Sequence, residues 1–186
     1  MNVARRKLDD IQLLAAGLGL RPSPRKRGPS RAERNAYWHA QFERLLELAG
    51  EWGYDVELVT GTDDRVEMGD ARTVWIDTRR HPETRCYTLL HELGHVLVRR
   101  RWSEFSEPHP TYLRHPDAEP HPSHRASPAF RVGLVSEELE AWRRGRRLAR
   151  RLGMRVDDAK WEREQCAALL GYIAWAARSG PVPGSR

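Results

Sequence analysis

Apolar residues recur every three or four positions through much of the chain, and this spacing predicts helices. The predicted helices span residues 4–18, 31–50, 82–101, 136–152 and 157–178. In the third helix the expected core stripe consists of Cys86, Leu90, Leu93 and Leu97. In the last helix the expected buried side consists of Trp161, Cys166, Leu169, Leu170 and Ile173. The chain is therefore predicted to be mainly helical.

Residues that typically begin and end helices support several of these boundaries. Ser30 is placed to cap the second helix, and Gly50 is placed to end it. Pro82 suits the first turn of the third helix, because that position needs no backbone donor. Ser136 is expected to cap the fourth helix, and Gly153 is expected to stop it.

Between residues 54 and 78 the spacing of apolar residues changes to two, which predicts strands. The predicted strands span residues 54–60, 65–68 and 73–78. The last two flank residues 69–72, a four-residue stretch typical of a hairpin turn. We therefore expect an α+β fold, in which a small, mostly antiparallel sheet of about three strands packs on the 82–101 helix. Further helices lie N-terminal and C-terminal to it.

The remaining segments divide the chain into a main domain and its appendages. Residues 1–30 are predicted to be an N-terminal helix and a basic linker, 31–180 the main domain, and 181–186 a tail. Within the domain, residues 103–130 contain six prolines and four histidines: His109, His115, His121 and His124. We predict a long loop or insertion there, and such loops are usually functional or disordered.

The charge of the chain permits contact with nucleic acid but does not require it. The 186 residues carry a net charge of +6, which is concentrated in residues 21–28 and 143–151. A disordered linker and a solvated helix face are the simpler interpretations of these two segments. Direct nucleic-acid contact through them remains an alternative.

Several features favour a cytoplasmic protein with no membrane partner. The apolar run at residues 11–20 is too short to span a bilayer. Asp9 and Asp10 precede this run and no small-residue cleavage site follows it, which argues against a signal peptide. Cys86 and Cys166 form no C-x-x-C pair, so we expect reduced, buried cysteines rather than metal ligands.

The sequence His91-Glu92-Leu93-Gly94-His95 lies in the middle of the predicted 82–101 helix. At about 100° per residue, His91 and His95 project from one face, one turn apart, and can bind the same Zn²⁺. Glu92 is then placed to take a proton from a metal-activated water and pass it to a leaving amine. The glycine between the two histidines indicates close packing at that point, because Gly destabilises a helix by about 1 kcal/mol.

A catalytic zinc usually has three protein ligands and one open position, so a third ligand is expected elsewhere. Glu137, Glu138 and Glu140 lie together in the predicted fourth helix. Glu140 shares a helix face with several arginines and is expected to pair with them in solvent. Glu138 shares a face with apolar residues and is the preferred ligand, whereas Glu137 is borderline. An acidic first turn that serves the helix dipole is the alternative interpretation of all three.

The sequence from Pro82 to His95 resembles the core of the ImmA/IrrE family of zinc metallopeptidases. The order of helix, small sheet, HExxH helix and glutamate-bearing helix is also similar, and the resemblance covers about residues 35–152. In that family the third ligand lies three residues before a small residue, as Glu138 precedes Ala141, although Trp142 replaces the usual Asn. The resemblance therefore implies Glu138 as a ligand, and a DNA-binding repressor as a typical substrate.

Together these observations predict a zinc-dependent metallopeptidase that hydrolyses a peptide bond. The resemblance alone implies that this bond lies in a regulatory, repressor-type protein. A substrate strand is expected to pair with the edge of the sheet. The alternative is a non-catalytic, zinc-containing regulator that binds DNA or a partner. A structural zinc site closed by a loop histidine is a third hypothesis. Tyr87 lies one turn before His91 and is expected to be a packed aromatic rather than a cleft residue.

Overall fold

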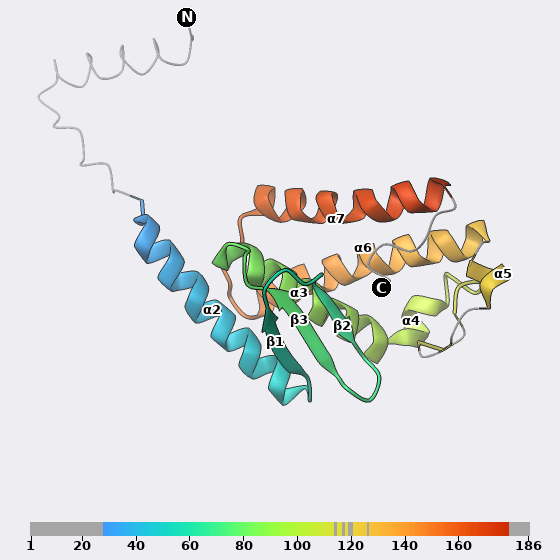
Figure 1. The fold of residues 1–186 in the computed structure, drawn as a ribbon, viewed down its shortest axis with the longest axis horizontal. Coiled ribbons are helices and arrows are strands. Elements are labelled where there is room, and N and C mark those ends of the chain that lie inside the picture. Colours follow the sequence, from blue (N-terminus) through green and yellow to red (C-terminus); the bar gives the residue numbers. More distant parts are fainter. Residues whose placement is uncertain (1–27, 114, 117, 119–120, 126, 179–186) are drawn as a thin grey trace, which may run out of the picture. The chain divides into compact units, whose positions relative to one another are not determined.

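A computed structural model describes residues 28–113, 115–116, 118, 121–125 and 127–178 (Figure 1). The predicted helix at 4–18, nearly all of the predicted basic linker and the predicted tail at 181–186 lie outside these residues. The chain divides into two compact units, residues 1–33 and 34–186. The described part of the second unit is α+β, as expected from the sequence. No helix among the described residues is long and apolar enough to cross a membrane.

The first described helix, α2, spans Arg31–Glu51 and confirms the prediction for 31–50. A reciprocal capping box begins it, because the Ser30 amide donates to Glu33 (2.6 Å) and the Glu33 amide donates to the Ser30 hydroxyl (3.2 Å). The helix is followed by Gly53, whose φ of 79° favours glycine. Its buried face consists of Trp38, Gln41, Phe42, Leu45 and Ala49.

The three predicted strands form one sheet in the order β1-β3-β2. They are β1 (Asp55–Val59), β2 (Arg65–Glu67) and β3 (Thr73–Asp77). The predicted hairpin is confirmed, since β2 and β3 pair antiparallel, with Val66 opposite Val74. The expectation of a mostly antiparallel sheet is wrong, because β1 pairs parallel to β3, with Val56 opposite Val74. The buried strand β3 takes the centre, and the exposed strands β1 and β2 become the edges.

Helix α3 spans Pro82–Arg100 and carries the predicted motif. Pro82 occupies the first turn, and the Glu83 amide donates to the His81 ring at 3.4 Å. Cys86, Leu90 and Leu93 are buried as predicted, whereas Leu97 is only partly buried. They share one hydrophobic core with α2 and with Val74 and Ile76 of β3.

The segment predicted to be a long loop contains two short helices, α4 (Trp102–Ser106) and α5 (Pro122–Arg125). The fourth predicted helix is α6 (Pro128–Arg151), and its expected start at Ser136 is wrong. The Ser127 hydroxyl accepts the Phe130 amide (3.1 Å) and Pro128 fills the first turn, so this pair begins the helix. A second, smaller core gathers around this region: Val98, Phe105, Tyr112, Phe130, Ala141 and Trp175.

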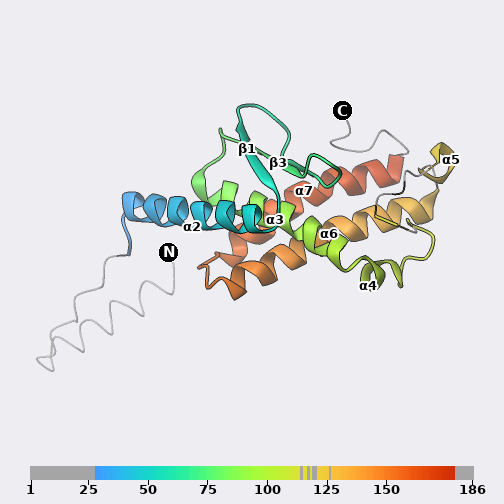
Figure 2. The same ribbon diagram turned by 90° about the horizontal axis from the view of Figure 1, so that it is seen from below.

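The last helix, α7, spans Asp158–Arg178, close to the predicted 157–178, and lies beside α6 (Figures 1 and 2). Its expected buried side is largely wrong. Trp161 is buried, but Cys166, Leu170 (65% exposed) and Ile173 (51% exposed) face outward. Trp161 belongs to the main core and Trp175 to the second core, so these two tryptophans fix the buried face of the helix.

Helices α3 and α6 approach each other backbone to backbone. A Cβ added at Gly94 would lie 2.8 Å from the carbonyl carbon of Ala141 and closer still to its oxygen. A Cβ added at Gly145 would lie 2.8 Å from the carbonyl carbon of Leu90. The two pairs place the helices antiparallel, and they confirm that Gly94 marks close packing. This contact sets the position of α6 relative to the HExxH motif.

Candidate metal centre

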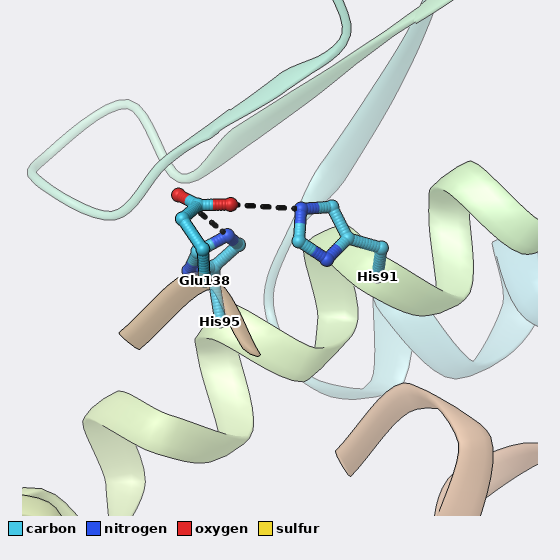
Figure 3. A group of neighbouring side chains, drawn as sticks. All are labelled: His91, His95 and Glu138. Carbon is cyan, nitrogen blue, oxygen red and sulfur yellow. Dashed lines mark ion pairs between the residues drawn. The ribbon is translucent and has the colours of Figure 1, made fainter. Parts of the chain in front are cut away.

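His91, His95 and Glu138 come together between α3 and α6 (Figure 3). One turn of α3 separates the two histidines, and α6 brings Glu138 against them. All three side chains are buried, and their potential ligand atoms lie within 4.8 Å of one another. The structure therefore brings together the three residues that the sequence predicts as metal ligands.

The separations between these atoms fit a single shared ion. Oε2 of Glu138 lies 3.4 Å from Nε2 of His91, and Oε1 of Glu138 lies 3.5 Å from Nε2 of His95. Ligand atoms held tetrahedrally by bonds of about 2.1 Å stand roughly 3.4 Å apart. These two separations involve different oxygens of Glu138, and together with the 4.8 Å limit for the whole group they are compatible with one shared ion.

The three neighbouring glutamates of α6 have different partners. Glu138 faces the histidines, whereas Glu140 accepts hydrogen bonds from Arg144 (2.9 Å) and Arg147 (2.7 Å), as predicted from its helix face. Glu137 accepts a hydrogen bond from the Tyr112 hydroxyl at 2.8 Å. Of these three glutamates, only Glu138 therefore lies next to Nε2 of both histidines.

Glu92 is buried next to the three candidate ligands without belonging to their group. Its Oε1 lies 3.9 Å from Nε2 of His91, and it lines the same cleft. Burial raises the pKa of Glu92, and the neighbouring histidines oppose this effect. A carboxylate with a raised pKa beside a metal site is suited to accept and release a proton.

The charges around the centre favour a cation. Burial alone would raise the pKa of Glu138, but His95 and His91 lower it well below its ordinary value. Burial alone would lower the pKa of His95, but Glu138, Glu137 and Glu92 together raise it well above its ordinary value. The carboxylates around His95 therefore stabilise a positive charge at this position, which a metal ion could supply.

The two histidine rings are held in different ways. Nδ1 of His95 lies 3.7 Å from Oε1 of Glu137. The ring of His91 instead stacks on Trp142, with ring centres 4.4 Å apart. Nδ1 of His91 is buried and has no hydrogen-bond partner among the described residues. Trp142 therefore positions a candidate ligand by stacking.

The centre opens into a cleft of about 690 Å³. One wall comes from the segment that joins β1 to β2, which includes Asp63 and Asp64, and from Arg65 of β2. The opposite wall comes from α7 and includes Glu164, Ala168 and Tyr172. Burial, followed by the carboxylate of Glu138, raises the pKa of Tyr172. The sequence pattern did not single out these wall residues, because they lie far along the chain from the motif.

Other candidates from the sequence lie away from the centre. Tyr87 is a packed aromatic, as expected, and its hydroxyl donates to Glu83 at 2.8 Å. His109 contacts the carbonyl of Phe105 (3.0 Å), and His124 contacts the carbonyl of Thr111 (2.6 Å). Among the described residues, none of the loop histidines joins the metal-binding group or lines the cleft.

The cysteines and the basic segments are distributed unevenly over the structure. Cys86 is buried, as expected, whereas Cys166 is exposed, contrary to expectation, and both are free thiols. The basic segment at 21–28 lies outside the described residues except for Gly28. In the basic segment of α6, Arg146 pairs with Asp158 of α7 (2.5 Å), while Arg143 is exposed. Part of the positive charge of α6 is therefore neutralised locally.

Comparison of the chain with protein-family models, with curated proteins and with solved structures found no match. The functional interpretation therefore rests on the residues and on the geometry of this site.

Proposed function

We propose that the protein is a zinc-dependent metallopeptidase, with His91, His95 and Glu138 as zinc ligands and Glu92 as general base and acid. The observation that carries this proposal is the convergence of the three ligand atoms. One potential ligand atom from each residue lies within 4.8 Å of the other two, and the two oxygens of Glu138 lie 3.4 Å from Nε2 of His91 and 3.5 Å from Nε2 of His95. The group is buried at the wall of an open cleft.

The composition of the group favours zinc in a catalytic rather than a structural role. Two imidazole nitrogens and one carboxylate are a known ligand set of catalytic zinc, which keeps its fourth position open for water or substrate. A structural zinc needs four protein ligands, and the group has three members among the described residues. The cleft beside them leaves room for the fourth position.

When bound, zinc would lower the pKa of a water molecule and polarise the substrate carbonyl. Glu92 lies beside the three ligands in the same cleft and can accept and release the proton. It accepts the proton of the attacking water and later donates it to the amine nitrogen of the departing peptide. Burial raises the pKa of Glu92, which brings its proton affinity closer to what this exchange requires. Trp142 holds the His91 ring by stacking while these steps occur.

A peptide substrate can bind along the edge of the sheet. Among the described residues, β2 pairs only with β3, so its other edge remains available for an extended peptide strand. Arg65 and Val66 of β2 also line the cleft. The resemblance to the ImmA/IrrE family favours a regulatory, repressor-type protein as the source of this peptide. The two free cysteines are consistent with action in a reducing cytoplasm.

The Glu92→Gln substitution tests the proposal, because Gln cannot accept the proton but keeps the shape of the side chain. The wild-type protein should hold one zinc ion per chain and cleave members of a peptide library. Glu92→Gln should keep the zinc and lose roughly 10²–10⁴-fold in cleavage rate. The matched change Glu104→Gln, at an exposed position of α4, should leave both properties unchanged.

Two outcomes would contradict the peptidase proposal. The first is a wild-type protein that takes up no zinc at stoichiometric concentrations. The second is a Glu92→Gln protein that keeps both zinc and the cellular effect of the wild type. The second outcome would instead favour the non-catalytic regulator that binds DNA or a partner protein.

A further inference from the structure

A line of polar contacts leads from the segment between α3 and α6 to the metal centre. The Tyr112 hydroxyl donates to Oε2 of Glu137 at 2.8 Å. The other oxygen of the same carboxylate, Oε1, lies 3.7 Å from Nδ1 of His95. On the far side of the His95 ring, Nε2 faces Glu138 at 3.5 Å. Glu137 therefore lies between a buried tyrosine and a candidate ligand.

Tyr112 is held firmly in the second hydrophobic core. Its ring packs against Phe130 at 5.1 Å between ring centres, and only 3% of the residue is exposed. A Cβ added at Gly133 would lie 2.5 Å from the ring, so the absence of a side chain at Gly133 makes room for it. Burial raises the pKa of Tyr112, so its hydroxyl stays protonated and can donate. The donor that meets Glu137 is therefore fixed in position.

In this arrangement Glu137 can control the tautomer and the orientation of the His95 ring. A neutral histidine binds a metal through one ring nitrogen, and the hydrogen bond made by the other nitrogen selects the tautomer. Ligand histidines commonly donate this second N–H to a carboxylate, which also fixes the orientation of the ring. Glu137 is the carboxylate that faces Nδ1 of His95. A hydrogen bond there leaves the lone pair of Nε2 directed towards Glu138 and the metal position.

We propose that Glu137 and Tyr112 are positioning residues of the metal centre: Glu137 holds His95 in the Nδ1–H tautomer, and Tyr112 holds Glu137. This inference rests on the proposed metal-binding function. The distance of 3.7 Å between Glu137 and His95 is that of an ion pair, and a shift of about 0.5–1 Å makes it a hydrogen bond. The Pro- and His-rich segment at residues 103–130 thus contributes no ligand of its own. Through Tyr112 and Glu137 it helps to hold the ligand His95 in position.

The two ligand histidines should respond differently to changes in this support. His91 has no carboxylate at Nδ1 among the described residues and is held by Trp142 instead. Loss of Glu137 should therefore alter the ring of His95 and leave that of His91 in place. The coordination geometry of the bound metal should change, rather than only the overall stability of the fold.

The test compares metal binding by Glu137→Gln, Tyr112→Phe and the control Glu140→Gln. Glu140 lies on the same helix but pairs with Arg144 and Arg147, away from the ligands. Affinity for Zn²⁺ is measured by chelator competition, and the visible absorption of bound Co²⁺ reports the coordination geometry. Thermal unfolding of each variant without metal measures the effect on the fold separately.

We expect Glu137→Gln to lose about 10–100-fold in zinc affinity and to show an altered Co²⁺ spectrum. Tyr112→Phe keeps the packed ring and should show a smaller loss in the same direction. Glu140→Gln should bind like the wild type. If Glu137→Gln does not fold, Tyr112→Phe decides the matter, because its only change is the hydroxyl group.

The outcomes separate this inference from the proposed function. A wild-type protein that binds neither Zn²⁺ nor Co²⁺ overturns both. A wild-type protein that binds one ion, with Glu137→Gln and Tyr112→Phe matching Glu140→Gln in affinity and spectrum, overturns only the positioning role. A loss of affinity in Tyr112→Phe without one in a folded Glu137→Gln also overturns it, because the effect would then not pass through the carboxylate.

Discussion

The contact between α3 and α6 differs sharply from the outer face of α7. At Gly94 and Gly145 the first two helices meet backbone to backbone, with no room for a side chain between them. On α7, Leu170 and Ile173 are exposed and Gly171 has open space around it. The proposed ligands and base all lie on the tightly packed pair, whereas α7 contributes only a wall of the cleft.

This difference indicates that close backbone packing of α3 and α6 fixes the positions of the proposed ligand atoms. A metal centre requires its ligand atoms to be placed to within about 0.5 Å, and rigid elements achieve this better than mobile ones. Because the two backbones touch, the distance between α3 and α6 does not depend on the conformations of intervening side chains. A wall that only bounds the cleft needs no such accuracy. We therefore expect the same type of substitution to change the free energy of unfolding differently in the two regions.

The largest expected contrast is that between Leu90→Ala on α3 and Leu170→Ala on α7. Leu90 is fully buried, so its truncation leaves a cavity and should lower the free energy of unfolding by about 2–5 kcal/mol. Leu170 is exposed, and its truncation should change that free energy by about 0.5 kcal/mol or less. Urea denaturation of both variants gives the two values. Equal losses would mean that α7 is buried in solution against a partner or a second copy of the chain.

The next contrast uses two glycines within helices. Gly94→Ala places a methyl group against the backbone of Ala141, which should destabilise the fold by about 1–3 kcal/mol. It also forces the helices apart, so zinc affinity should fall as well. Gly171→Ala meets nothing within 4 Å and should stabilise the fold by up to about 1 kcal/mol, because Ala favours the helix.

Urea denaturation and zinc competition of the two glycine variants would sharpen the comparison. A Gly94→Ala protein with wild-type stability and wild-type zinc affinity would contradict the claim that backbone contact sets the distance between the ligands. A destabilised Gly171→Ala protein would show that α7 is packed more closely than its open surroundings indicate.

The same two regions show which features could be predicted from the sequence. His91, His95 and the packing role of Gly94 follow from the spacing of one helix, which is a local property. The apolar face that Glu138 shares favours it as the third ligand, and its burial agrees with that argument. Helix periodicity failed on α7, where Leu170 is apolar but exposed. Apolar character alone does not reveal whether a helix face meets the core or remains on the surface.

Other features depended on contacts between distant parts of the chain. Residue alternation is the same in parallel and antiparallel strands, so the pairing of β1 with β3 could not be predicted from it. The start of α6 at Pro128 was hidden by the high proline content around it. The hydrogen bond from Tyr112 to Glu137 joins the segment between α4 and α5 to helix α6, and no local spacing indicates it.

The smallest expected effect is a difference in reactivity between the two thiols, Cys86 in α3 and Cys166 in α7. Measuring it probes the two regions without altering the stability of the fold. Cys86 of α3 is buried, and burial raises its pKa to about 12, so little thiolate forms at pH 8. Cys166 of α7 is exposed and free. An alkylating reagent at pH 8 should therefore label one thiol per native chain and two per unfolded chain, as counted by mass spectrometry.

The control is the Cys166→Ser variant, in which only Cys86 can react. The slow alkylation of Cys86 in this variant measures how often the α3 region opens. Rapid labelling of Cys86 in that variant would mean that α3 opens readily, and the contrast between the two regions would then no longer hold.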